Sequence, residues 1–393
     1  MNDRAALDLL LEHGPLSRAR IGALTGLSKP TASQLLARLE AAGLVVATGT
    51  SRGRPGPNAQ LYEVNPRAAY AAGLDVNPSR VRAAVADVTG AVVGEFTLPT
   101  PRRGGPGAVR QVTDALDGAV KAAGLTRDDV HRVVIGTPGA FDPSTGRLRY
   151  ASHLPGWHGP GLLEELAAAL PMPVEYENDV NLVAVAEQRL GAAAGHRDFV
   201  LLWIEEGLGA ALVLGGRLHR GFTGGAGEVG FLPVPGAPLV RNVARTGSGG
   251  FQELAGAAAV PRLAREWGID VPSGESAEAA VRVLRDAAAE AGAVSEAAGG
   301  AYGRLLDAYA TRLATGLAAL VAVLDPALVV LSGDVAVAGG EPLRGRVAAE
   351  LAELAAARPR LVLGSVRERP VLRGALEVAL AATRDDVFDT SAR

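Results

Sequence analysis

The stretch WIEEGLGAALVLGG (203–216) contains the residue types of a phosphate-binding turn. It predicts a strand, a glycine-containing turn and a second apolar strand, an arrangement that can present backbone N–H groups to an anion. The turn opens, however, with two acids, Glu205 and Glu206. Each carboxylate would repel a phosphate charge by about 1 kcal/mol at ~4 Å in a water-like dielectric, and by more in a cleft. The stretch is therefore either a nucleotide cradle or a turn that has lost that role.

A second group of chemically suggestive residues lies near the amino terminus. Two short helical patterns, RAALDLLLEHG (4–14) and SRARIGALTGLS (17–28), place Leu7, Leu10 and Leu11, then Ile21 and Leu24, toward a core. A third helix begins at Ser28 as N-cap, with Pro30 in its first turn. Ala32, Leu35, Leu36 and Leu39 form its buried face. The opposite side carries polar side chains that suit a major groove: Lys29, Thr31, Ser33, Gln34 and Arg38.

Two strand patterns, LVVATG (44–49) and AQLYEVN (59–65), follow this helix and flank TSRGRPGPN. They predict a hairpin wing with Arg52 and Arg54, which suits a narrow minor groove. The first 66 residues hold seven basic and five acidic residues, whereas the whole chain has a net charge of −3. A winged helix-turn-helix explains these features together. The alternatives are a helical dimerisation or capping module with an Arg/Pro loop, and for Arg38 a contact with phosphate or with solvent alone.

Composition excludes several classes of site. The 393 residues contain no cysteine, so disulfides, thiolate zinc sites and cysteine nucleophiles are excluded. The first residues carry acids where a secretory signal has basic residues, and apolar stretches such as LATGLAALVAVL are shorter than a membrane span. We therefore expect a cytoplasmic protein with no membrane partner.

From residue 70 the pattern is α/β, and several ordered motifs resemble one family. These are GTPGAFDPSTGRLRYASHLPGWHG (136–159), ENDVNLVAVAEQRLGAA (177–193) and GGAGEVG (224–230). Their order and spacing resemble the ROK family of repressors and sugar kinases, in its transcriptional-regulator branch. The resemblance implies an actin-like, sugar-kinase-like two-lobed ATPase fold behind the winged helix-turn-helix. We expect the head at 1–66, the first lobe at 67–183 with a carboxy-terminal helix near 372–384, and the second lobe at 184–371.

The resemblance also implies a sugar site. In the family's kinases the residue matching Asp179 is the base that takes a proton from the sugar, and those matching Asn178 and Glu228 hold hydroxyls. Gly139 in the Pro-Gly loop and His153, which replaces the usual Asn, complete the candidate ligand-binding set. Asp179 has a purely structural alternative as a helix N-cap. His153 could instead report pH or only fill space.

Departures from the kinase pattern affect the nucleotide and zinc positions. The first phosphate loop has Asn77, Pro78 and Ser79 in place of Gly-Gly-Thr, and Glu205 and Glu206 occupy the second. This favours loss of nucleotide binding. The positions matching the family's zinc ligands hold Phe231, Ala244, Thr246 and Phe251, none of which can ligate zinc. We predict no cofactor, no metal and no catalytic residue, with packing by the two Phe holding that loop.

These observations predict a DNA-binding transcriptional regulator, of the repressor type, that senses a small molecule such as a sugar or sugar derivative. Its partners are then a double-stranded operator, the effector and a second copy, as a homodimer or a dimer of dimers. One alternative is a regulator whose body only dimerises, and another is an active sugar kinase. We also expect Asp334 to lie in a turn and the tail DDVFDTSAR (385–393) to be disordered.

Overall fold

The first helices of the chain begin and end at local capping signals. The computed structural model describes residues 2–50, 59–100, 107–142, 145–149, 154, 156–157, 159, 161–243, 248–293 and 300–389. The Ser17 side chain caps the second helix and the Ser28 side chain caps the third. Gly26, with φ 73°, ends the second helix in the left-handed region that favours glycine. The elements of this head are α1 (Asn2–His13), β1 (Leu16–Ser17), α2 (Arg18–Thr25), α3 (Lys29–Ala41), β2 (Val45–Thr50) and β3 (Gln60–Val64).

The head has the expected helix order and hairpin, with one strand more than predicted. Strands β2 and β3 pair antiparallel, and β1 adds to β3, so the order is β1-β3-β2. The buried face of α3 consists of Ala32, Leu35, Leu36 and Leu39, as predicted. The prediction for Leu24 is wrong: this residue is 37% exposed. The buried face of α2 is centred on Ile21 and Gly22, which leaves Leu24 at its flank.

A five-stranded sheet follows, with the order β10-β7-β4-β5-β6. The strands β4, β5 and β6 form an antiparallel meander, and β7 pairs parallel to β4. Helix α4 packs closely on β6 at Gly94. A side chain at this position would overlap the backbone of Ala119, so the close approach requires glycine. The elements of this region are η1 (Pro66–Ala68), β4 (Tyr70–Asn77), β5 (Arg80–Asp87), β6 (Val92–Pro99), α4 (Ala108–Ala122), η2 (Arg127–Asp129), β7 (Val130–Thr137), α5 (Leu162–Ala169) and β10 (Val174–Asn178).

A second five-stranded sheet has the order β13-β12-β11-β14-β15, and both of its faces are covered. Along β11, Phe199 and Leu201 face a core shared with α6, whereas Val200 and Leu202 face a larger core beneath the later helices. This alternation is the two-residue period of a strand buried on both sides. The elements are β8 (Ala140–Asp142), β9 (Arg147–Arg149), α6 (Asp179–Leu190), β11 (Phe199–Ile204), β12 (Leu208–Leu214), β13 (Arg217–Leu218), η3 (Val229–Phe231), α8 (Gly250–Ala255), α9 (Ala259–Glu266), α10 (Ser276–Ala293), α11 (Ala301–Leu324), β14 (Leu328–Ser332), α12 (Asp334–Leu354), β15 (Arg360–Leu363) and α13 (Pro370–Phe388).

Two local expectations in this part of the chain need correction, and one helix has the length and composition of a membrane span. Asp334 is the first residue of α12 rather than part of a turn, and the helix bends at Gly340 (φ 56°) before Pro342. Helix α11 is long and apolar enough to span a membrane by length and composition, although half of its most apolar window is buried in the protein. Residues 385–388, expected to be disordered, form the last turn of α13. Val387 and Phe388 are buried there in the core of the head.

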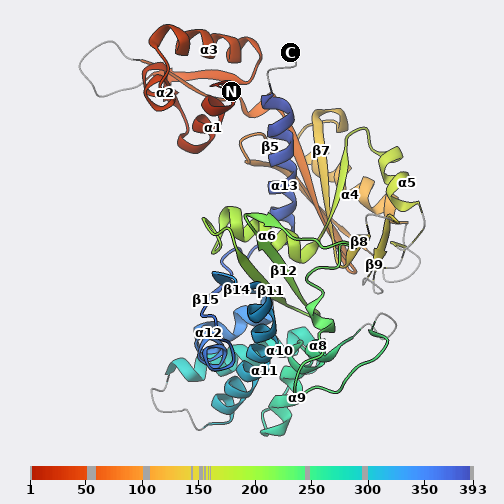
Figure 1. The fold of residues 1–393 in the computed structure, drawn as a ribbon. Helices are drawn as coiled ribbons and strands as arrows, with labels where there is room; N and C mark the ends of the chain where they lie inside the picture. Colours follow the sequence, from red (N-terminus) through yellow and green to blue (C-terminus); the bar gives the residue numbers. More distant parts are fainter. Residues whose placement is uncertain are drawn as a thin grey trace. The chain divides into compact units, whose positions relative to one another are not determined.

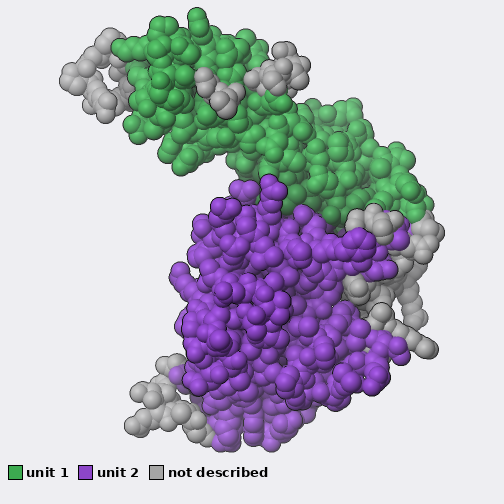
Figure 2. Space-filling view, viewed as in Figure 1, with its two compact units in different colours: residues 1–136, 161–176, 375–393 green, residues 137–160, 177–374 purple. Residues whose placement is uncertain are grey.

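The chain divides into two units, drawn in different colours in Figure 2, and the course of the chain through them is drawn in Figure 1. Unit 1 comprises residues 1–136, 161–176 and 375–393, so it contains the head, most of the first sheet and the larger part of α13. Unit 2 comprises residues 137–160 and 177–374. The bounds of a separate head at 1–66 therefore stay a prediction.

Candidate functional site

The recognition helix α3 presents a polar face as the sequence predicts. Lys29, Thr31 and Gln34 are exposed, and Ser33 is partly exposed. The Ser28 side chain, which caps the helix, lies 2.8 Å from the Thr31 hydroxyl and accepts from the Thr31 N–H at 3.4 Å. The Thr31 hydroxyl is therefore shared between the cap and any outside partner.

Arg38 has a protein partner within the head. Its Nη2 and Nε donate to the carboxylate of Asp3 on α1 at 2.5 and 3.2 Å, which raises the pKa of the guanidinium. The Arg38 side chain nevertheless remains 60% exposed. The sequence suggested phosphate or solvent as its partner and gave no sign of Asp3, which lies on α1. Arg52 and Arg54 of the predicted wing lie outside the described residues, as does His153.

Asn178 connects two segments of the predicted sugar site. Its Oδ1 accepts from the Asn181 N–H at 3.1 Å and so caps α6, while its Nδ2 donates to the Gly139 carbonyl at 2.9 Å. Gly139 has φ 75°, the left-handed conformation that turns its carbonyl toward Asn178 at little steric cost. An amide has two donors and two lone pairs, so Asn178 retains capacity for a ligand hydroxyl.

Asp179 is the first residue of α6, and its Oδ1 accepts from the Val180 N–H at 2.8 Å. The structural alternative for Asp179 as N-cap is therefore wrong, because Asn178 occupies that position. With the cap supplied by its neighbour, the Asp179 carboxylate is placed at the helix N-terminus, where the helix dipole favours negative charge.

Glu177 and Arg220 form an ion pair that sequence reasoning missed. The nearly buried Glu177 carboxylate accepts from Arg220 Nε at 2.7 Å and Nη2 at 2.6 Å, and from Asn181 Nδ2 at 2.8 Å. The Asn178 N–H also donates to it at 2.9 Å. These bonds fix the start of α6 against the segment that follows β13. The only signal in the sequence is the position of Glu177 at the head of the Glu-Asn-Asp motif.

Glu228 lies on a loop that runs along β12. Gly227, with φ 98°, leaves no room for a side chain against the Ala210 carbonyl, and its own carbonyl accepts from the Ala210 N–H at 2.8 Å. The adjacent Gly209 approaches Val180 of α6, so α6 and the Glu228 loop meet neighbouring residues of one strand. Burial raises the pKa of Glu228 to about 7, because the charged form loses solvation.

The loop beyond Glu228 is held by packing at the positions that match the family's zinc ligands. Phe251 is fully buried against α11, where Gly316 leaves room for its ring. Its N–H donates to the Leu232 carbonyl at 2.9 Å, which joins α8 to the end of η3. The backbone of the half-buried Phe231 packs closely on Gly249. Ala244 and Thr246 lie outside the described residues, and the residues that are described contain no group of three or more His, Asp or Glu side chains arranged to hold a metal ion.

The first phosphate-loop position is a self-contained turn between β4 and β5. Asn77 Oδ1 accepts from the N–H groups of Ser79 and Arg80, at 3.0 and 3.1 Å, and from the Ser79 hydroxyl at 2.9 Å. Pro78 has no N–H to donate. The donors that could bind a phosphate are therefore already bonded to one side chain of the same turn.

The second phosphate-loop position, the tip between β11 and β12, is closed in a similar way. The Glu205 N–H donates to the Gly207 carbonyl at 3.0 Å, and the Leu208 N–H donates to Gln252 Oε1 at 2.7 Å. Glu206 Oε2 accepts from the Ala277 N–H at 3.1 Å, which satisfies a free donor at the N-terminus of α10. Glu206 thus serves as a helix cap from a distant loop.

This fold and these loops define a body of sugar-kinase type preceded by a winged helix-turn-helix. Residues 71–382 match the model of the ROK family, and residues 3–54 match that of the MarR family. The chain belongs to the ROK family.

Two relatives illustrate the range of similar proteins. The chain is 28% identical to a glucokinase of Halalkalibacterium halodurans over 69% of this chain and 82% of that one. It is 27% identical to the xylose repressor of Caldicellulosiruptor bescii over 60% of this chain and 59% of the repressor.

Two solved structures show the same fold. A ROK hexokinase from Thermus thermophilus matches with a TM-score of 0.64 and 28% identity, covering 80% of this chain and 99% of that one. A ROK family transcriptional regulator, a homologue of the Escherichia coli MLC protein, matches with a TM-score of 0.72 and 18% identity, covering 98% and 97%. The second likeness includes the head.

Proposed function

We propose that this protein is a DNA-binding transcriptional regulator of the repressor type whose ROK body senses a sugar or sugar derivative. The observation that carries the proposal is a contrast between two sets of loops. Asn178, Asp179 and Glu228 hold polar groups on the framework of α6 and β12, whereas backbone donors of both phosphate loops, those of Arg80 and Leu208 among them, are bonded within the chain. A sugar site without a phosphoryl donor is a receptor site.

The relatives support a sugar as the effector and an operator as the partner. The xylose repressor, the Escherichia coli regulator NagC and an N-acetylglucosamine repressor of another Escherichia coli strain each match 60% of this chain. The head supplies the DNA-binding part, with Lys29, Thr31, Ser33 and Gln34 facing the major groove and Arg52 and Arg54 on the wing. A single head reads only a half-site, so we propose a homodimer that can pair into a dimer of dimers. Such a regulator acts in the cytoplasm.

The glucokinase relatives define the competing function, an active sugar kinase. Asp179 is in place for it, since a carboxylate can take the proton of an attacking hydroxyl. Phosphoryl transfer also needs donors and a cation around the phosphates, and here the N–H groups of Ser79 and Leu208 are bonded to Asn77 and Gln252. We therefore propose that the body binds sugar without phosphorylating it. A regulator that uses its body only to dimerise is the third possibility.

Thermal melting of the full chain separates the three functions. A ligand that binds only the folded state raises its stability, so xylose, N-acetylglucosamine, glucose and ATP with Mg²⁺ are each tested. The proposal predicts a shift with a sugar that is lost in Asp179→Asn, and no shift with ATP. A shift with ATP together with sugar phosphorylation would establish the kinase. No shift with any sugar, together with retained DNA binding, would establish the dimerisation body.

DNA binding is tested with a duplex selected by the wild-type chain from a random-sequence library. Gln34→Ala should relax base preference, whereas Lys29→Ala should weaken binding to all sequences and reduce the salt dependence. Failure to enrich any duplex would overturn the regulator function.

A further inference from the structure

The last turn of α13 completes the core of the head. Val387 and Phe388 are 4% and 2% exposed, and they pack in one cluster with Leu7 and Leu10 of α1 and with Leu39 of α3. The guanidinium of Arg4 lies 5.6 Å from the centroid of the Phe388 ring, within cation–π range. The head is thus built from both ends of the chain.

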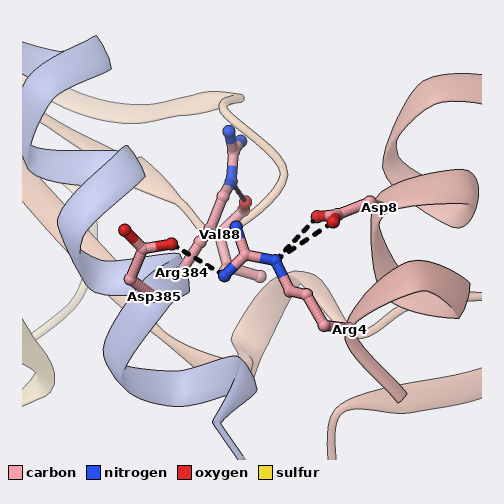
Figure 3. A network of polar contacts seen from close by, with 5 residues as sticks. All are labelled: Arg4, Asp8, Val88, Arg384 and Asp385. Carbon is pink, nitrogen blue, oxygen red and sulfur yellow. Dashed lines mark hydrogen bonds and ion pairs between the residues drawn. The ribbon is translucent and has the colours of Figure 1, made fainter. Parts of the chain in front are cut away.

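Successive residues of this turn bind the head and the first sheet in alternation. Arg384 Nε donates to the Val88 carbonyl at 2.8 Å, beside the turn between β5 and β6. Asp385 accepts from Arg4 Nη1 on α1 at 2.7 Å, and Arg4 Nε also donates to Asp8 at 2.9 Å (Figure 3). Asp386 pairs with Arg132 of β7 at 2.8 Å. The turn therefore contacts α1 through Asp385 and the sheet region through its neighbours.

Helix α1 passes this anchoring on to the recognition helix. Asp3, the residue before Arg4, forms the two hydrogen bonds with Arg38 of α3. Adjacent residues of one helical turn therefore connect α1 to two other helices, α13 through Arg4 and α3 through Asp3. A displacement of the last turn of α13 therefore acts directly on Arg4, and through the adjacent Asp3 it acts on Arg38 of α3.

The opposite end of α13 lies against α6, the helix that begins at Asn178 and Asp179. The first residues of α13, up to Gly374, belong to unit 2 together with α6. Gly374 packs directly on the Leu182 carbonyl, in the first turns of α6, and a Cβ there would overlap that oxygen. A backbone contact this close transmits small shifts, because neither side can yield by rotating a side chain.

We propose that α13 couples the effector site to the DNA-reading helix along the path α6, α13, α1 and α3. The path uses four contacts: Leu182 with Gly374, Phe388 with the head core, Asp385 with Arg4, and Asp3 with Arg38. As a route of regulation it rests on the proposed function. As a mechanical link between helices it does not, so the coupling and the proposed function can be disproved separately.

Hydrogen exchange of the full chain tests the link at the head. Asp385→Asn should speed amide exchange in residues 29–41 by about two- to five-fold, the range for a half-exposed ion pair. Asp386→Asn is the matched control, since it lies in the same turn but pairs with Arg132 of β7. Equal effects of the two variants on α3, or no effect of Asp385→Asn, would overturn the link.

Gly374→Ala tests the other end of the path. Its new methyl group should raise exchange both in residues 179–183 of α6 and in residues 29–41 of α3. The control is Gly345→Ala in α12, where a Cβ meets no atom within 4 Å. A change confined to α6 would overturn the proposal. None of these measurements needs a sugar or DNA. If the chain bound neither, the proposed function would be wrong, but hydrogen exchange would still test the coupling.

Discussion

The loops of the predicted sugar site and the loops at the two phosphate-loop positions use the same kinds of groups in opposite ways. At Asn178 and Glu177 the polar atoms are oriented by partners such as Gly139 and Arg220, and this network holds the Asp179 carboxylate at a helix N-terminus. At the other two loops, side chains instead accept from backbone donors of the turn: Asn77 from the Arg80 N–H and Gln252 from the Leu208 N–H.

This contrast predicts that internal hydrogen bonds of a turn oppose ligand binding in addition to charge. A turn whose N–H groups are already bonded gains little by exchanging them for a ligand, since each internal bond must first be broken. Repulsion by Glu205 and Glu206, inferred from the sequence, is therefore only part of the barrier. The following predictions test this contrast.

The largest effect is expected for Arg220→Ala, which leaves the nearly buried Glu177 carboxylate without its cation. We expect the free energy of unfolding to fall by about 2–3 kcal/mol, less than for a fully buried pair because Arg220 is 54% exposed. Urea titration measures it, with the exposed Arg217→Ala as control. A loss equal to that of the control would show that the pair does not hold α6.

The pKa of Glu228 predicts a specific pH dependence. Because its pKa of about 7 in the fold exceeds the ordinary 4.5, the folded state holds the proton more tightly. Its contribution to stability is fully present below pH 4.5 and is lost as the pH rises through 7, and between pH 5 and pH 8 the loss is on the order of 2 kcal/mol. Unfolding at pH 5 and pH 8 should show this decline in the wild type and in Glu165→Gln, but a smaller one in Glu228→Gln.

Asn178→Ala should cost about 1–2 kcal/mol, since α6 loses its cap and Gly139 its donor. Asn178→Asp is the matched variant, because it keeps the capping oxygen but lacks the amide donor. We expect Asp to recover most of the melting temperature and none of the sugar-induced shift. Recovery of that shift by Asp would remove the amide from the effector site.

The smallest effect is expected for Glu205→Gln combined with Glu206→Gln. The change removes both charges but keeps the oxygen that caps α10, so stability should change by only about 0.5 kcal/mol. Calorimetry should still detect no ATP binding. Measurable ATP affinity would mean that charge alone prevents ATP binding and that the internal hydrogen bonds of the turn do not.

Much of the architecture could be predicted from the sequence, because the relevant signals are local or periodic. Ser28 and Pro30 mark the start of α3, and the apolar spacing after them gives its buried face. The strand, turn and strand of 203–216 follow from apolar residues on either side of a glycine-containing turn. The family motifs predicted the fold of the body.

Several of the errors share a different origin, since they concern contacts between distant segments. The tail at 385–393 has few apolar residues and was expected to be disordered, yet Val387 and Phe388 enter a core whose other members lie within the first 88 residues. Asp3 beside Arg38 and Arg220 beside Glu177 likewise carry no periodic signal. At Asp179 and Asn178, adjacent residues both suit a helix start, and only the geometry decided between them.

The distance of 381 positions between Arg4 and its partner Asp385 has a consequence for synthesis. Domains generally fold from the amino terminus as they leave the ribosome. The head emerges first but lacks Phe388 and the Asp385 contact until α13 has been translated. During that interval the nascent head has an incomplete core, so a full-strength DNA-binding surface arises only after the sensing body has been made.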